Sequence, residues 1–362
     1  MGDRFAVVGA TGYTGGLVVR ELLRRGTAVV AVGRNPEKLR HLPPEVEQKV
    51  VAGSDTVALS EALGGCRAVV SCVGSFADLG EAVVSAAITA SAHYVDTTGE
   101  VPFMRRVFEV HGAPARQTGV TLVPGMAFHS SPADLAAALA ARALGQVPET
   151  VEVAYRLAGA KPSRGTLRTN LRRALMPCQV WQDGRLVPRR IGDDPRPFSF
   201  PEPFGEASVV RWPGGEVLSV PRHIGASSVA VFMGMPKAAA AIFRSARITS
   251  LLQPVGRALV GQATGGPSAA ARHEARFAVV VEARADGAGA RCVIEGRDVY
   301  GVTAAACAEA VQRLAAADPP SGALAAAEVF DPAGFLDSLS DYLSWRVETM
   351  TQHVPRGGAR RP

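Results

Sequence analysis

A glycine-rich turn near the start of the sequence limits the folds that this chain can adopt. The apolar run at residues 5–8 leads directly into Gly9-Ala-Thr-Gly-Tyr-Thr-Gly15, and a helical pattern follows. In such a strand–turn–helix unit Gly9 permits the tight turn, Gly12 lets the backbone approach a pyrophosphate, and Gly15 allows the helix to pack closely on the strand. The start of the helix offers N–H groups to phosphates. We therefore predict a dinucleotide site made by Gly9, Thr11, Gly12, Tyr13, Thr14 and Gly15.

Short apolar runs alternate with helical patterns over the first third of the chain. The predicted strands are residues 4–8, 28–32, 47–52, 67–73, 93–96 and 119–123, and the predicted helices are 12–25, 36–42, 56–63, 79–91 and 101–118. The strand runs lack polar alternation, which is typical of strands that are covered on both faces. This order of elements predicts a parallel, doubly wound α/β sheet of the Rossmann type, with right-handed crossovers.

The pattern changes at about residue 151, where we predict a second, α+β domain. Its predicted elements are a strand at 151–157, a basic helix at 163–175, a hairpin at 179–187, two strands within 209–219 around Pro213-Gly-Gly215, a helical stretch at 236–263, paired strands at 275–284 and 290–298, and a helix at 303–316. We assign residues 1–130 and 302–350 to the Rossmann domain, 131–301 to an inserted substrate and dimerisation domain, and 351–362 to a flexible tail.

The end of the second predicted strand indicates which dinucleotide binds. The strand ends in Ala31-Val-Gly-Arg34, where an NAD enzyme places a carboxylate for the ribose 2′-hydroxyl. Arg34 instead offers a planar fork that matches a phosphate, and Lys38 adds charge one helical turn later. The sequence therefore predicts NADP(H) as the cofactor.

Polar and small residues follow three other predicted strands and face the same crevice, because ligands of such sheets bind outside the carboxyl ends of the strands. We expect the nicotinamide ribose beside the residues that end the fourth strand and the adenine beside those that end the third. The further predicted cofactor contacts are Ser54, Asp55, Cys72, Val73, Gly74, Ser75, Phe76 and Gly99. Asp96 and Glu100 end the fifth strand, as catalytic carboxylates or as helix caps.

These motifs resemble those of the saccharopine dehydrogenase-like oxidoreductases. The resemblance rests on the glycine turn, Ser71-Cys-Val-Gly74, His93-Tyr-Val-Asp-Thr-Thr-Gly-Glu100, Val123-Pro-Gly125, Pro132-Ala-Asp134, Gly296-Arg-Asp-Val-Tyr-Gly-Val-Thr-Ala304 and Asp331-Pro-Ala-Gly-Phe-Leu336. The branch that contains bacterial trans-acting enoyl reductases is the most similar. The resemblance implies a Rossmann domain, an inserted substrate domain, a late helix that returns to the first domain, NADP(H) chemistry and a homodimer.

The chain departs from that pattern at two positions. Ser75 stands where the family usually has proline, and His129-Ser-Ser131 stands where it usually has an aspartate near Phe128. Both positions belong to the expected nicotinamide end of the crevice. The resemblance therefore implies the cofactor and leaves the substrate open.

Three electrophiles can take a hydride from such a cofactor. Reduction of a conjugated C=C needs donors for the carbonyl oxygen that gains charge, and the candidates are His129, Tyr155, Ser130 and Ser131. Reduction of a C=N would instead use Asp96 or Glu100 to stabilise the iminium, and Arg156 or Arg164 to hold substrate carboxylates. Carbonyl reduction ranks third, since no Tyr-x-x-x-Lys pair is evident. A protein that senses NADP(H) without turnover is the alternative to an enzyme.

Composition limits the partners. A net charge of +6 with only 20% charged residues permits an acidic partner, and Arg168 and Arg172 share a helical face that suits an acyl carrier protein or a CoA phosphate. Nothing resembles a DNA-binding helix pair, so no nucleic acid is expected. The five cysteines form no Cys-x-x-Cys pair, which favours reduced thiols, no metal and a cytoplasmic location. No apolar run reaches the about 18 residues that a membrane span needs.

Overall fold

The first sheet consists of parallel strands in the order expected for a doubly wound fold. The computed structural model describes residues 3–173, 177–236 and 265–351, and this sheet has the order β15-β6-β5-β4-β1-β2-β3. Its strands are β1 (Arg4–Val8), β2 (Ala28–Gly33), β3 (Glu47–Val50), β4 (Ala68–Ser71), β5 (His93–Asp96), β6 (Thr121–Val123) and β15 (Gly322–Ala323). The predicted Rossmann-type sheet is confirmed, and β15 is a seventh strand that the sequence analysis missed.

Helices cover both faces of this sheet, because successive side chains of its strands β1, β2 and β4 are apolar and buried. They are α1 (Tyr13–Arg24), α2 (Pro36–Leu39), α3 (Thr56–Leu63), α4 (Phe76–Thr89), α5 (Val101–Arg106), the π-helical turn η1 (Val107–His111) and α6 (Gly112–Gln117). In β1, Val7 packs into one buried cluster with Leu17 of α1, whereas Val8 packs into the other with Val83 of α4. Two apolar faces thus fix the sheet as the middle layer.

The second sheet is mixed and, in the part of the chain that the structure describes, has nine strands. It runs β10-β11-β12-β7-β13-β14-β16, and the hairpin of β8 and β9 pairs beside β12. The strands are β7 (Thr150–Ala158), β8 (Cys178–Gln182), β9 (Arg185–Arg189), β10 (Arg196–Ser199), β11 (Glu206–Arg211), β12 (Ser228–Gly234), β13 (Arg276–Ala285), β14 (Ala288–Arg297) and β16 (Leu343–Thr351). Both predicted hairpins are confirmed. Asp183-Gly184 and Asp286-Gly287 have positive φ at both residues, as tight hairpin turns require.

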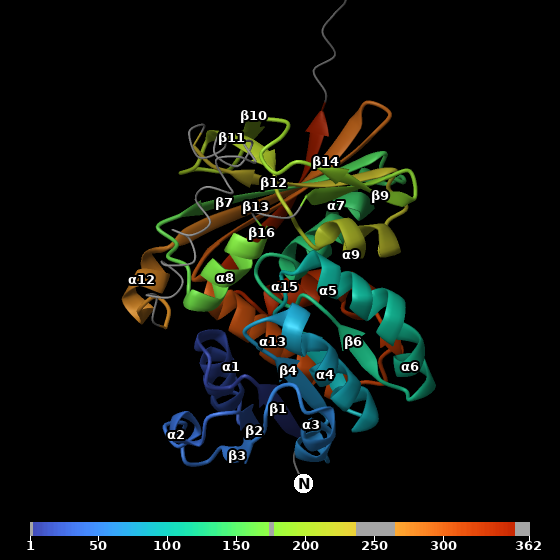
Figure 1. The fold of residues 1–362 in the computed structure, drawn as a ribbon. Helices are drawn as coiled ribbons and strands as arrows, with labels where there is room; N and C mark the ends of the chain where they lie inside the picture. Colours follow the sequence, from blue (N-terminus) through green and yellow to red (C-terminus); the bar gives the residue numbers. More distant parts are fainter. Residues whose placement is uncertain (1–2, 174–176, 237–264, 352–362) are drawn as a thin grey trace, which may run out of the picture.

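Helices α7 (Ser131–Leu144) and α9 (Glu216–His223) lie between this sheet and the first one (Figure 1). The predicted second strand after Pro213-Gly-Gly215 is wrong, because α9 begins there. Its Val217 and Val220, three residues apart, are buried on one helical face. The predicted basic helix is α8 (Arg164–Arg173), and α12 (Ala269–Glu274) precedes β13. The helical stretch predicted for 236–263 and the tail predicted for 351–362 lie outside the described residues, except for residues 236 and 351.

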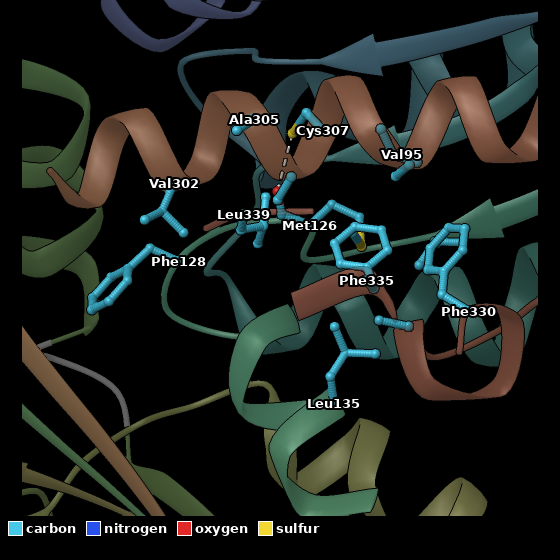
Figure 2. Close-up of a cluster of buried hydrophobic side chains, with 14 of the residues drawn as sticks. Val95, Met126, Phe128, Leu135, Val302, Ala305, Cys307, Phe330, Phe335 and Leu339 are labelled. Atoms are coloured by element: carbon cyan, nitrogen blue, oxygen red, sulfur yellow. Dashed lines mark hydrogen bonds between the residues drawn. The ribbon is translucent and has the colours of Figure 1, made fainter. Parts of the chain in front are cut away.

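A late helix returns to the first domain. α13 (Val299–Ala316) packs against α1, β4 and β5, and α14 (Ala326–Val329) and α15 (Pro332–Asp337) follow. Figure 2 shows Cys307 of α13 above Met126, whose carbonyl accepts a hydrogen bond from the thiol at 3.0 Å, with Leu135 and Phe335 nearby. The chain then enters the second sheet again as β16, although we assigned residues 302–350 to the first domain. The domain boundaries stay a prediction.

Candidate cofactor-binding and active site

The glycine turn accepts only glycine at two of its positions. Gly9 has a φ of +82°, and a Cβ there would lie 2.6 Å from the carbonyl oxygen of Cys72. A Cβ on Gly15 would lie 2.2 Å from the carbonyl oxygen of Gly9, so this residue lets α1 pack on the turn. Gly12 is the N-cap of α1, and no acidic side chain occupies the first helical turn. The turn therefore presents uncompensated N–H groups, which suits a pyrophosphate.

The end of β2 brings Arg34 beside that turn. The carbonyl oxygen of Val32 accepts hydrogen bonds from the N–H groups of Gly9 at 2.9 Å and Ala10 at 3.4 Å. Arg34, two residues on, is exposed, and so is Lys38 in α2. The side chain between them, Asn35, accepts from the N–H of Lys38 at 3.0 Å and caps α2. Two exposed cations thus follow β2 near the glycine turn, and Glu37, the carboxylate between them in the sequence, pairs with Arg40.

Asp55, a predicted adenine contact, has another bond in the structure. Its carboxylate accepts a hydrogen bond from the N–H of Ala58 at 3.0 Å and so caps α3, while Ser54 beside it is exposed. An aspartate at a strand end can bind a ligand or cap the next helix, and the pattern in the sequence is the same for both.

Glu100 likewise could bind a ligand or bond the start of a helix, and in the structure it bonds the start of a helix. Its two carboxylate oxygens accept hydrogen bonds from the N–H groups of Phe76 at 3.2 Å and Ala77 at 3.0 Å, the first residues of α4. An anion at a helix N-terminus satisfies free N–H groups and opposes the helix dipole. Ser75, the N-cap of α4, bonds Asp78 through its hydroxyl at 2.5 Å. Glu100 therefore fixes the loop of residues 72–76 that the nicotinamide ribose is expected to approach.

Asp96 lies inside the protein rather than in the crevice. Its side chain is fully buried and accepts hydrogen bonds from the N–H groups of Thr98 at 2.8 Å and Gly125 at 2.9 Å, and from the hydroxyl of Tyr94 at 2.9 Å. Burial raises the pKa of Asp96 to about 6, although these bonds counteract it. Asp96 thus ties the end of β5 to the turn after β6.

That turn carries the predicted proton donors His129, Ser130 and Ser131. The Nε2 atom of half-buried His129 lies 3.1 Å from the carbonyl oxygen of Thr98. A carbonyl only accepts, so Nε2 carries the hydrogen of this bond. Ser130 and Ser131 are buried, and the hydroxyl of Ser131 donates to the carbonyl of Ala127 at 3.4 Å.

A buried pair of polar side chains lies behind this turn. The hydroxyl of Tyr155, in β7, donates to the carboxylate of Glu216, in the first turn of α9, and the two residues are 2% and 0% exposed. The ring of Tyr155 meets Phe128 edge-on at 5.9 Å. A Cβ on Gly215 would lie 3.2 Å from the hydroxyl of Ser130, so α9 begins against the His129 turn. Sequence reasoning missed Glu216, because one acidic residue in an apolar run carries no signal of burial.

Arg156 and Arg164 are the two arginines that were predicted to hold substrate carboxylates. Arg156 donates to the carbonyl of Gly234 at 3.1 Å, and Arg164 is exposed at the start of α8, as is Arg168 one turn later.

Within residues 3–173, 177–236 and 265–351, no cluster of His, Cys, Asp and Glu could hold a metal ion. No helix in those segments is long and apolar enough to cross a bilayer. Burial raises the pKa of the Cys72 thiol to about 12, which makes it a poor nucleophile.

Comparison with known proteins places the cofactor function in the first third of the chain. Residues 9–98 match a family model described as NAD(P)H-binding. The chain is 33% identical over 144 residues to a lipid droplet localized protein of Caenorhabditis elegans, and 31% identical over 147 residues to a probable mitochondrial saccharopine dehydrogenase-like oxidoreductase of Arabidopsis thaliana. It is 33% identical over 136 residues to the trans-acting enoyl reductase of Mycobacterium leprae. These matches cover 35–36% of this chain and 32–34% of the relatives, so it spans about a third of their length.

The likeness in fold covers nearly the whole chain. Saccharopine dehydrogenase (L-Glu forming) of Saccharomyces cerevisiae superposes with a TM-score of 0.64 over 96% of this chain and 100% of that one, at 14% identity. At this identity the likeness shows the fold alone. The chain thus has an NAD(P)H-binding Rossmann domain, sequence similarity to a saccharopine dehydrogenase-like oxidoreductase and to trans-acting enoyl reductases over about a third of its length, and the fold of saccharopine dehydrogenase.

Proposed function

We propose that this protein is an NADPH-dependent reductase that adds hydride to a conjugated C=C of a small-molecule, carrier-bound or CoA-bound intermediate. The cofactor preference is supported by one observation, the exposed Arg34 at the end of β2 beside the glycine turn. A guanidinium matches the 2′-phosphate of NADP(H) with two hydrogen bonds, whereas NAD(H) has only a hydroxyl there. Lys38 adds a second cation, and the glycines allow the close backbone contacts that form the turn.

The reduction is supported by the side chains around the His129 turn. The bound cofactor would supply a hydride for the β carbon of an enoyl group. His129 would then donate to the carbonyl oxygen that gains charge, or to the α carbon. Because its Nε2–H already bonds Thr98, a second donated bond must come from Nδ1 of the protonated ring. Tyr155 and Glu216 would hold the turn from behind.

Reduction of a C=N is the second candidate. The two carboxylates that we predicted for it, Asp96 and Glu100, accept backbone hydrogen bonds that fix the loops around the crevice. These bonds disfavour a direct role at an iminium. Glu216 remains as a carboxylate next to the His129 turn and gives this alternative its structural basis. A protein that senses NADP(H) without turnover is the third candidate.

The partners of the enzyme remain part of the proposal. Arg164 and Arg168 are exposed on α8, which suits an acidic carrier protein or a CoA phosphate. A homodimer and a cytoplasmic location follow from the resemblance and from the reduced cysteines, and the inserted domain would provide the dimer contact.

Kinetics with the two nicotinamide cofactors test the proposal. Oxidation of NADPH and NADH is measured with enoyl thioesters, enones and cyclic imines as acceptors, for the wild-type protein, Arg34→Ala and Arg40→Ala. Arg40 is an exposed arginine that pairs with Glu37, and it serves as the matched control. We expect Arg34→Ala to raise KM for NADPH about 10- to 100-fold, since a charge-assisted hydrogen bond is worth about 1.5–3 kcal/mol. KM for NADH should stay the same in every variant.

Two results would contradict this account. Equal use of NADPH by Arg34→Ala and the wild type would remove Arg34 from the cofactor site. Oxidation of NADPH with the cyclic imines alone would favour the second candidate, and cofactor binding without turnover of any acceptor would favour the third.

A further inference from the structure

The side chain of Tyr13 connects the glycine turn to the second domain. Its hydroxyl donates to the carbonyl of Pro267 at 2.5 Å and accepts from the guanidinium of Arg272 at 3.1 Å. Its ring meets Tyr300 edge-on, with the ring centres 5.0 Å apart. A Cβ on Gly266 would lie 2.6 Å from ring atoms of Tyr13, so the backbone at Gly266 packs directly on the ring. Four contacts thus hold a residue whose own N–H belongs to the first turn of α1.

The residues that hold Tyr13 are themselves fixed. Arg272 also donates to the carboxylate of Asp298 at 2.9 Å, and Asp298 is 3% exposed. The second carboxylate oxygen of Asp298 accepts from the N–H of Gly301 at 2.8 Å and caps α13. The hydroxyl of Tyr300 accepts from the N–H of Ser163 at 2.7 Å, just before α8. A partly buried ion pair and the starts of two helices therefore support the contact of Tyr13.

The contact leads from the cofactor turn toward the reaction site. The segment of residues 265–274 continues into β13, whose Val279 pairs with Tyr155 of β7. Contacts thus connect Tyr13 with the strand beside Tyr155 and, through Tyr300, with the start of α8.

We propose that Tyr13 and Arg272 are positioning residues that hold the glycine turn in its cofactor-binding shape and couple dinucleotide binding to the second domain. The inference rests on the proposed function, because it takes the glycine turn as the cofactor site. A turn that is already held loses less conformational freedom when the pyrophosphate binds, so affinity rises. Coupling is reciprocal, so the bound cofactor stabilises residues 265–274 to the same extent.

Binding and hydrogen exchange test this inference together. Affinities for NADPH and NADH are measured by calorimetry for the wild type, Tyr13→Phe, Arg272→Met and Arg276→Met. Arg276 is exposed four residues after Arg272 and serves as the control. Tyr13→Phe loses the bonds to Pro267 and Arg272, and Arg272→Met loses those to Tyr13 and Asp298. We expect each variant to weaken NADPH binding about 3- to 10-fold. Arg276→Met should bind as the wild type does.

Amide exchange with and without NADPH separates coupling from a general loss of stability. In the wild type, NADPH should slow exchange in the glycine turn and also in residues 265–274. In Tyr13→Phe it should slow exchange in the turn alone. A residue that only stabilises the fold would speed exchange in both states and leave the response to NADPH unchanged, which would overturn the inference.

The two proposals fail in different ways. If the wild type binds NADPH and both variants bind it equally well, the coupling is wrong and the proposed function stands. If the wild type binds NADH in preference, the same variants test the coupling with NADH, and only the NADPH preference is wrong. If it binds neither dinucleotide, both proposals are contradicted.

Discussion

The four side chains predicted as catalytic form two groups, which differ in the atoms to which they are hydrogen-bonded. Asp96 and Glu100 each accept two backbone N–H groups, whereas His129 and Tyr155 lie on or behind the turn after β6. A buried carboxylate is costly unless hydrogen bonds compensate it, so bonds of this kind indicate a structural role. Strand-end patterns predicted that Asp96, Glu100 and His129 follow strands of the first sheet, and their catalytic roles stay a prediction. They did not predict what each one bonds, because that depends on N–H groups of other elements.

Tyr155 and Glu216 give a prediction at the scale of single residues. Tyr155→Phe keeps the ring contact with Phe128 but leaves the buried carboxylate of Glu216 without its phenol donor, at the start of the helix that packs against the His129 turn. We expect kcat for the proposed reduction to fall about 10- to 100-fold, while the affinity for NADPH stays unchanged. Glu216→Gln keeps the shape and an acceptor, so its kcat should fall less. Steady-state kinetics with separate cofactor titrations check both. Full kcat in Tyr155→Phe would show that this pair has no part in the reaction.

At the scale of elements, local pattern predicted the first sheet well and the second less well. Strands β1 to β6 of the first sheet and the two Asp-Gly hairpins have sequence signals within a few residues of themselves. The start of α9 has no such local signal, because Pro213-Gly-Gly215 has the sequence of a hairpin turn. The helix forms there because Val217 and Val220 are buried where α9 packs against α7 and β12. β15 has two residues and exists only because it pairs with β6.

The junction of α7, α9 and α14 depends on a buried ion pair. His223 Nε2 lies 2.9 Å from Asp134, whose other oxygen accepts from the N–H of Ala327 at 2.9 Å. Burial opposes both charges, but the mutual attraction outweighs it. It lowers the pKa of Asp134 below 3.8 and raises the pKa of His223 above 6.5. Glu328 also raises the pKa of His223, and Arg142 lowers it.

The sign of the pH dependence follows from these directions. The contribution of His223 to stability is complete below pH 6.5 and is lost as the pH rises through its raised pKa. The contribution of Asp134 is complete above pH 3.8 and is lost as the pH falls through its lowered pKa. The pair therefore stabilises the junction most between these two values.

His223→Gln tests this pair by urea unfolding from about pH 5 to about pH 9. The wild type should lose stability as the pH rises above 6.5, and the variant should lack that part of the loss. Below this pH the variant should be less stable by about 3 kcal/mol, because Asp134 stays buried without its cation. His273, exposed on α12, gives the control variant His273→Gln. Parallel curves for the wild type and His223→Gln would exclude the ion pair as the cause.

At the scale of the whole molecule, the contacts that join the two sheets could not be predicted from local sequence patterns. Tyr13 and Arg272 are 259 residues apart, and Tyr155 and Glu216 are 61 apart. The glycine turn could be predicted because all its residues are adjacent in the sequence. The proposed reaction site combines the turn after β6, β7 and α9, so its composition depends on how these elements pack.

Transfer of deuterium tests the central claim most directly. The protein is incubated with NADPH that carries deuterium at the transferred position of the nicotinamide, together with free, CoA-bound and carrier-bound enoyl thioesters, enones and cyclic imines. We predict a saturated product with deuterium on the β carbon of the former C=C, located by mass spectrometry and NMR. Deuterium on a carbon next to nitrogen, or NADPH binding with no transfer to any acceptor, would contradict the account.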